Sequence, residues 1–103
     1  MSFHPEWIIT AEELMPLIGQ VTLLDVRQPE EHKEARIEGC KLIPLSEIPE
    51  RAPNELRKED DIVIYCAHGI RSLHALMAMQ AMGFQKLRSL EGGIESWKDA
   101  RGR

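Results

Sequence analysis

The sequence lacks an excess of basic charge, a long apolar run and a recognisable signal-peptide pattern after Met1. Lysine and arginine number 13 against 17 aspartates and glutamates, so the formal net charge is -4. Binding to a nucleic-acid backbone requires a basic face, so this balance argues against nucleic acid as a ligand. No apolar run approaches the roughly 18 residues that span a bilayer. Met1 is not followed by the charged and apolar regions of a signal peptide. We therefore expect a cytoplasmic protein with no membrane partner.

Cysteine is also scarce, and the two cysteines, Cys40 and Cys66, show no metal-binding pattern. Without an export signal, reduced thiols are expected rather than a disulfide. The chain has four histidines, His4, His32, His68 and His74. Only Cys66 and His68 have a spacing that suits one ion, and that pair lacks two further ligands. No metal site is therefore expected.

The chain has 103 residues, of which 43% are hydrophobic and 29% charged, which is ordinary for a globular protein. This length favours one domain over residues 1–103. No apolar stripe stands out on the predicted surface, so a monomer is the simplest expectation.

Short apolar runs alternate with helix signals along the chain. Strands are predicted at residues 7–9, 21–26, 40–43, 61–65 and 86–90. Helices are predicted after a capping box at Thr10, after Pro29, over residues 72–82 and from Ile94. Residues 49–59 are charged and contain proline, which predicts a surface connection with at most one helical turn. Strands that alternate with helices predict an α/β fold with a parallel sheet covered on both faces.

The stretch from Cys66 to Ser72 carries the strongest chemical signal. It follows the predicted strand 61–65, contains Gly69 and leads into a predicted helix. Backbone N–H groups in such a loop can converge on one point, and the helix N-terminus adds positive potential there. Arg71 adds a fixed positive charge. We therefore expect a lowered pKa for Cys66 and a nucleophilic thiolate.

Other side chains near this loop are expected to support the structure, and Arg71 has two possible roles. Asp25 and Arg27 lie at the carboxyl end of the strand 21–26, which meets the same edge of the sheet. Asp25 is expected to accept hydrogen bonds from the loop or from neighbouring backbone N–H groups, and Arg27 to form an ion pair. Cys40 is expected to pack in the core. Arg71 either binds an anionic donor or holds the loop and shifts the thiolate pKa, and both interpretations stay open.

Four segments together resemble the single-domain rhodanese family of sulfurtransferases. They are LLDVRQPEEH from Leu23, IEGCKLIPLSEI from Ile37, CAHGIRS from Cys66 and LEGGIESW from Leu90. The resemblance covers residues 10–97 and implies a three-layer α/β/α fold with a mostly parallel five-stranded central sheet. Two positions depart from the family pattern: Arg36 stands where histidine is usual, and Cys40 stands where alanine is usual.

The resemblance implies a sulfur-transfer mechanism centred on Cys66. Its thiolate would take a sulfane sulfur from a donor such as thiosulfate or a protein persulfide, forming a persulfide. A thiophilic acceptor (cyanide, a thiol or a protein) would then remove that sulfur. The outer sulfur would be bound by the loop that comprises Ala67, His68, Gly69, Ile70, Arg71 and Ser72. No metal or organic cofactor is required.

Two other functions remain as alternatives. One is a persulfide carrier or a rhodanese-like interaction module that serves a partner protein. The other is a cysteine phosphatase or arsenate reductase, whose loop conventionally places five residues between cysteine and arginine. Here only four residues lie between Cys66 and Arg71. The shorter loop suits a single sulfur atom better than a tetrahedral oxyanion.

Overall fold

The computed structural model describes residues 5–102. The expectations for the start of the chain and for His4 lie outside the described residues, and the single domain over 1–103 stays a prediction. The elements in chain order are η1 (Pro5–Trp7), β1 (Ile8–Ile9), α1 (Ala11–Leu14), η2 (Met15–Leu17), β2 (Thr22–Asp25), α2 (Pro29–Glu34), β3 (Lys41–Leu42), η3 (Leu45–Glu47), α3 (Ile48–Glu55), β4 (Asp61–Tyr65), α4 (Ile70–Ala81), β5 (Lys86–Leu90) and α5 (Gly93–Arg101), where η denotes a 3-10 helix. None of the described helices is long and apolar enough to cross a membrane.

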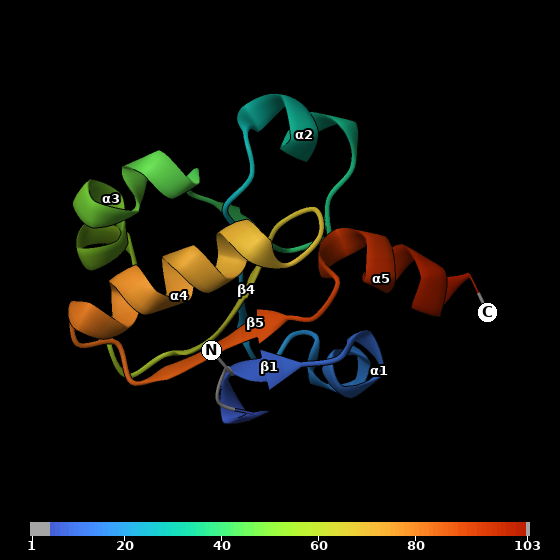
Figure 1. Ribbon diagram of the computed structural model, residues 1–103, viewed down its shortest axis with the longest axis horizontal. Coiled ribbons are helices and arrows are strands. Elements are labelled where there is room, and N and C mark those ends of the chain that lie inside the picture. The colour runs from blue at the N-terminus through green and yellow to red at the C-terminus, as the bar shows by residue number, and fades with distance from the viewer. Residues whose placement is uncertain (1–4, 103) are drawn as a thin grey trace.

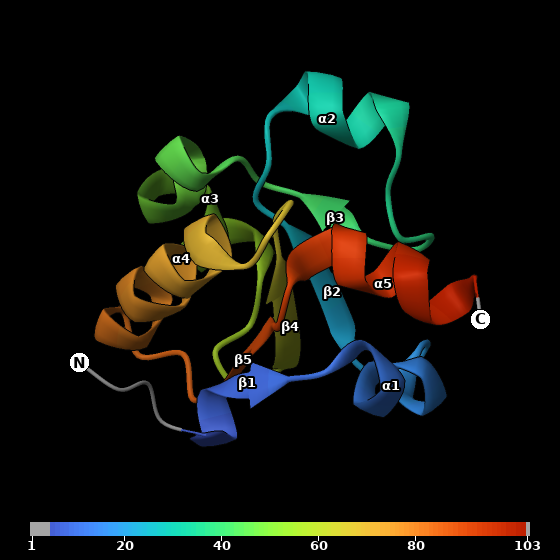
Figure 2. The same cartoon turned by 45° about the vertical axis from the view of Figure 1, so that its right-hand side comes forward.

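The five strands form one sheet in the order β1-β5-β4-β2-β3, and every neighbouring pair is parallel. Helices α3 and α4 cover one face, and α1 and α5 cover the other (Figures 1 and 2). This arrangement confirms the predicted three-layer α/β/α fold. Because all strands run the same way, the segments that follow β2, β4 and β5 meet at one edge of the sheet.

A separate apolar core fills the space on each side of the sheet. Alternate residues of β4 divide between the two cores: Ile62 and Ile64 face α3 and α4, while Val63 and Tyr65 face α1 and α5. This alternation follows from the two-residue period of a strand. The near-continuous apolar sequence of β4 therefore reflects burial on both faces.

Local signals account for several element boundaries. Thr10 and Glu13 form the predicted capping box: the Glu13 N–H donates to the Thr10 hydroxyl, and the Thr10 N–H donates to the Glu13 carboxylate. Helix α1 then gives way to 3-10 geometry at Met15–Leu17, a segment that contains Pro16. Gly83 follows α4 with a left-handed φ of 101°, and the buried Phe84 comes next.

Two predictions about helices were wrong. Residues 49–59 are not merely a connection, because Ile48–Glu55 forms the eight-residue helix α3. Pro49 lies in its first turn, where a missing N–H is tolerated, and the fully buried Ile48 and Ala52 lie on one helical face. Helix α4 begins at Ile70 rather than at Ser72, and Ile70 itself is 67% exposed.

Candidate active site

Cys66 lies directly after β4, and its sulfur is surrounded by hydrogen-bond donors from the loop that follows. The Gly69 N–H donates to Cys66 Sγ at 3.1 Å, and the Ser72 N–H donates to it at 3.4 Å. Gly69 takes a left-handed φ of 102° immediately before α4, a conformation that favours glycine. The loop therefore directs two amides and the start of α4 at the sulfur, although the Cys66 residue is only 1% exposed.

These contacts decide the protonation of the thiol. Burial acts to raise the pKa of Cys66, but hydrogen bonds from the Ser72 side chain and from the Ser72, Gly69 and His68 amides outweigh it. The pKa of Cys66 is therefore held below its ordinary value of 9.0. Hydrogen bonds to the charged form are the cause, so the site favours a thiolate.

A buried serine on β5 extends this set of hydrogen bonds. Ser72 Oγ lies 3.5 Å from Cys66 Sγ and 2.7 Å from Ser89 Oγ. When Cys66 is ionised, the Ser72 hydroxyl can donate to the sulfur while it accepts from Ser89. Sequence reasoning missed Ser89. The available signal was a polar residue inside an otherwise apolar predicted strand.

The first turn of α5 supports the loop from the other side. The Ile94 N–H donates to the Cys66 carbonyl at 2.9 Å, and the Glu95 N–H donates to the Ala67 carbonyl at 3.3 Å. Gly93, with a φ of 63°, lies so close that a Cβ atom there would collide with both of these carbonyls. The glycines of the LEGGIESW segment therefore let α5 contact the loop backbone directly.

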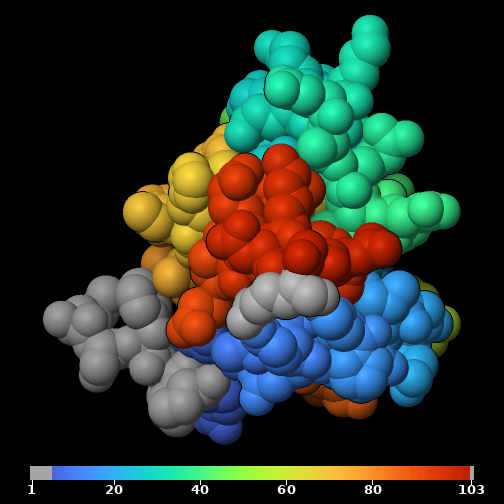
Figure 3. All heavy atoms as spheres, turned by 90° about the vertical axis from the view of Figure 1, so that its right-hand side faces the viewer, coloured from blue at the N-terminus to red at the C-terminus, as the bar shows by residue number. Residues whose placement is uncertain are grey.

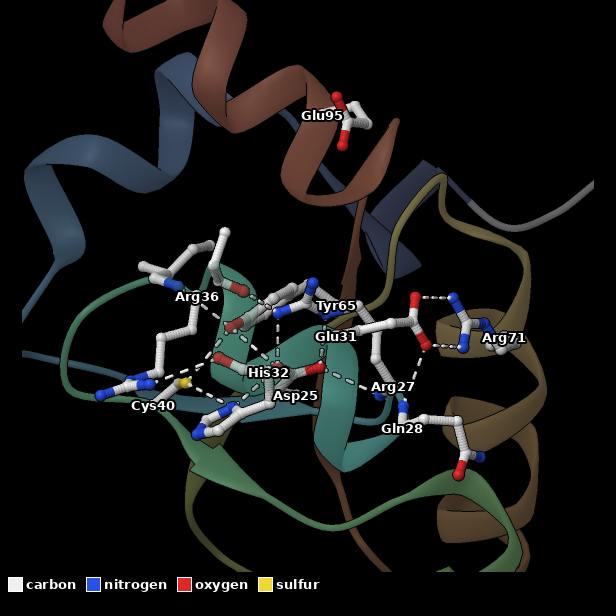
Figure 4. Close-up of polar contacts among 12 residues, drawn as sticks. Asp25, Arg27, Gln28, Glu31, His32, Arg36, Cys40, Tyr65, Arg71 and Glu95 are labelled. Atoms are coloured by element: carbon white, nitrogen blue, oxygen red, sulfur yellow. Dashed lines mark hydrogen bonds and ion pairs between the residues drawn. The ribbon is translucent and has the colours of Figure 1, made fainter.

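Arg71 forms a bidentate ion pair with Glu31 on α2, in which two guanidinium nitrogens each bind one carboxylate oxygen. The two nitrogen–oxygen distances are 2.7 and 2.8 Å, and Figure 4 shows the paired groups facing each other. Hydrogen bonds from Arg71 lower the pKa of Glu31 to about 2. Glu31 is likewise the first cause of the raised pKa of Arg71, with the charge of Cys66 a smaller one. Sequence reasoning identified Arg71 but not this partner, which is 40 residues away.

Asp25 and Arg27 form a buried ion pair behind the loop. Asp25 Oδ1 accepts from the Arg27 backbone N–H and from its Nε, both at 2.9 Å, and Oδ2 accepts from Nη2 at 2.8 Å. Burial acts to raise the pKa of Asp25, but the bonds from Arg27 and His32 lower it overall. These contacts match the expected ion pair and neighbouring backbone N–H. They hold the turn after β2. The partners of Asp25 drawn in Figure 4 are Arg27, His32 and Tyr65, which all lie outside the Cys66 loop.

Cys40 packs against the core under α1 and α5, in keeping with the expected core packing, but its sulfur also contacts a polar cluster. It is half-buried, accepts from the Tyr65 hydroxyl at 3.2 Å and lies 3.9 Å from His32 Nδ1 (Figure 4). Burial raises the pKa of Cys40, so this residue favours the thiol form. The partners come from α2 and β4, and nothing near Cys40 in the sequence indicated them.

Among the described residues, this cluster groups three side chains of types that bind metal ions. Asp25, His32 and Cys40 each offer one ligand atom, and these atoms lie within 4.8 Å of one another. The sequence spacing did not predict this grouping. The facing oxygen, Asp25 Oδ2, already accepts from Arg27, and it also lies within hydrogen-bond distance of His32 and Tyr65. The cluster is therefore a hydrogen-bond network.

The two cysteines lie on opposite sides of the sheet. Cys66 belongs to the core under α3 and α4, whereas Cys40 packs against the core under α1 and α5. Two strand spacings, β3 to β2 and β2 to β4, also separate their strands. Neighbouring strands lie about 5 Å apart, so the strands next to the two cysteines are separated by about 10 Å. A disulfide tolerates a Cα–Cα distance of only about 7 Å. The geometry leaves no internal disulfide partner for Cys66.

A pocket of about 180 Å³ lies beside the loop, between α2 and α5. Ala67 contributes to it from the loop, and Glu31, Glu34, Glu95 and Lys98 contribute charged groups. In Figure 3, α2 and α5 meet on the face toward the viewer, with the start of α4 at their side. A larger pocket of about 570 Å³ lies at the opposite end of β4 and includes Asp61. We place the site at the smaller pocket because only that one adjoins the loop.

The chain is similar to known proteins over most of its length. The family model for the rhodanese-like domain matches residues 10–100. A sulfurtransferase of Allochromatium vinosum is 36% identical over 77 residues, which cover 75% of this chain and 71% of that protein. A putative sulfur carrier protein of Bacillus subtilis, YrkF, is 42% identical over 77 residues. This chain spans 41% of the length of YrkF.

Solved structures share the whole fold. The human single-domain sulfurtransferase TSTD1 superposes with a TM-score of 0.82 and 28% identity, covering 90% of this chain and 96% of that one. A Rhodopseudomonas palustris protein of unknown function, named a possible tyrosine phosphatase, superposes with a TM-score of 0.79 and 27% identity. That match covers 91% of this chain and 80% of the other.

Proposed function

The chain belongs to the rhodanese-like family, and from that premise we propose that it is a sulfurtransferase that carries the transferred sulfur as a persulfide on Cys66. The observation that carries the proposal is the polar surroundings of one sulfur atom: two amides donate to Cys66 Sγ, and the Ser72 hydroxyl lies within hydrogen-bond distance and can donate once the thiol is ionised. These donors stabilise a thiolate, and the thiolate is the form of cysteine that attacks sulfur. Relatives named sulfurtransferases support the same class.

The reaction has two displacement steps. The Cys66 thiolate attacks the outer sulfur of a donor, such as thiosulfate or a persulfide. A new sulfur–sulfur bond forms while the donor's own bond to that sulfur breaks, and the electron pair leaves with sulfite or a thiolate. An acceptor such as cyanide or a thiol then attacks the outer sulfur, and Cys66 leaves as the thiolate. Preorganised loop amides stabilise negative charge in both steps.

A persulfide carrier is the second candidate, and the similarity to the putative sulfur carrier YrkF favours it. A carrier would form the same persulfide but would transfer it to a partner protein rather than turn over with cyanide. A phosphatase is less well supported, because one residue fewer separates Cys66 from Arg71 than in phosphatase loops.

The experiment measures the intact mass of the protein after it is mixed with thiosulfate or with glutathione persulfide. The mass should rise by one sulfur atom in the wild type and in Cys40→Ser, and should stay unchanged in Cys66→Ser. Steady-state transfer to cyanide should follow the same pattern. Turnover of p-nitrophenyl phosphate without a sulfur adduct from either donor would overturn the proposal.

A further inference from the structure

The basic side chains around the Cys66 loop are all engaged by carboxylates of the same chain. Arg71 binds Glu31 through two nitrogens, at 2.7 and 2.8 Å. Arg27 binds Asp25, and Lys98 Nζ lies 3.5 Å from Glu95. Glu34 adds a further carboxylate to the pocket beside the loop. Four carboxylates therefore face three basic groups, and the local balance is negative.

The Arg71–Glu31 pair is the one that bears on the reaction, because Arg71 is the only arginine or lysine within the loop. Both oxygens of Glu31 are occupied by Arg71, and Oε1 also accepts from the Gln28 N–H at 3.0 Å. That last bond fixes the carboxylate at the start of α2. The paired side chains are each about one-third exposed, so the pair is accessible to a substrate but is held by two elements.

We infer that Glu31 determines donor specificity: by occupying Arg71, it disfavours the thiosulfate dianion and leaves the loop suited to persulfide donors. This inference rests on the proposed function. A dianion that binds at the loop meets no unpaired arginine, and it must either displace Glu31 or accept repulsion from it. A persulfide, R–S–SH or R–S–S⁻, brings at most one negative charge to the transferred group. Glu31 acts through Arg71 and is therefore a positioning residue.

The charges of the two reactions make the distinction explicit. With thiosulfate, Cys66–S⁻ and S–SO₃²⁻ give Cys66–S–S⁻ and SO₃²⁻, so three negative charges gather at the loop. With a persulfide, Cys66–S⁻ and R–S–SH give Cys66–S–SH and R–S⁻, with one negative charge, and an ionised donor R–S–S⁻ raises the total to two, still below the three of thiosulfate. Repulsion from a nearby carboxylate scales with that charge.

The test compares Glu31→Gln with the wild type on three donors. Glutamine keeps an oxygen that can accept the Gln28 N–H, so α2 should remain folded. We expect kcat/KM for thiosulfate to rise about tenfold, mainly through a lower KM, since one charge is removed near a dianion. For glutathione persulfide and for a persulfidated cysteine desulfurase, the change should stay below about threefold. These two arms separate a small persulfide source from a protein one.

Two further variants complete the design. Glu59→Gln removes a carboxylate that pairs with Arg57 just before β4, at the end remote from Cys66, and should leave every donor unchanged. Arg71→Ala should lower thiosulfate activity much more in the Glu31→Gln background than in the wild type.

Equal gains for all donors in Glu31→Gln, or a loss for thiosulfate alone, would overturn the inference while the sulfurtransferase assignment stood. A protein-persulfide response as large as that of thiosulfate would overturn it as well. Absence of a Cys66 persulfide with every donor would instead overturn the proposed function.

Discussion

At the scale of single residues, Ser72 contacts the Cys66 sulfur directly, whereas Arg71 acts on it only through its charge. The Ser72 backbone N–H donates to Cys66 Sγ and the Ser72 hydroxyl lies 3.5 Å from that sulfur, whereas the Arg71 guanidinium points to Glu31. The bond from the Ser72 hydroxyl is the first of the interactions that lower the pKa of Cys66. Ser89 orients that hydroxyl from β5.

Ser72→Ala should therefore raise the pKa of Cys66. A hydrogen bond to a charged group is worth about 1.5–3 kcal/mol, so the pKa should rise by at least about one pH unit. The thiolate forms as the pH rises through this pKa, so the midpoint of alkylation by iodoacetamide should move to higher pH. Mass spectrometry of the labelled peptides separates Cys66 from Cys40.

The exposed Ser46 provides the control for this measurement. Ser46→Ala should leave the Cys66 midpoint where it is. In the wild type, Cys66 should react below pH 9 and Cys40 above it, because their pKa values move in opposite directions from 9.0. An unchanged or lowered Cys66 midpoint in Ser72→Ala would refute the assigned role of the hydroxyl.

At the scale of elements, the first turn of α5 contacts the Cys66 loop and holds it in place. Gly93→Ala would bring a Cβ atom into the carbonyls of Cys66 and Ala67. It should reduce the free energy of unfolding by about 1–3 kcal/mol through backbone strain. It should also slow Cys66 alkylation, because the displaced loop no longer directs its amides at the sulfur. Chemical denaturation and alkylation rates measure the two effects.

Gly19 is a matched control, since it also has a positive φ, of 89°, but no atom within 4 Å of a Cβ built there. Gly19→Ala should show the loss of stability while Cys66 keeps its reactivity. If both variants slow alkylation equally, the contact between α5 and the loop is not what positions the sulfur.

Elements whose signals are local could be predicted from the sequence. The capping box at Thr10, the strand 61–65 and the left-handed Gly83 each depend on residues close together in the chain. Helix α3 was missed because Pro49 and Pro53 suggest a break, while the burial of Ile48 and Ala52 against the core that stabilises it comes from tertiary packing.

The same limit applies within the site. Cys66 and its loop lie in one segment, so the sequence indicated them directly. The Glu31–Arg71 pair joins residues 40 positions apart, and the bond from Tyr65 to Cys40 spans 25. Within its own segment Glu31 is simply an acid in the first turn of α2. Its partner depends on where the fold brings α2 and α4 together, which local sequence does not encode.

At the scale of the whole molecule, the sheet divides the interior into two cores that should respond independently to substitution. Ile48→Val on the α3 side and Ile9→Val on the α1 side should each cost about 0.5–1.5 kcal/mol. The double variant should lose the sum within about 0.5 kcal/mol, because the two side chains share no packing partners. Urea denaturation of the four proteins measures this. A coupling above about 1 kcal/mol would show that the sheet transmits strain between its faces.

The placement of Cys40 and Cys66 across this sheet has a kinetic consequence. If Cys66 carries the proposed persulfide, the protein cannot release that sulfur by forming a disulfide between its own two cysteines, so an acceptor molecule must take it. The rate of sulfur release, plotted against acceptor concentration, should then pass through the origin.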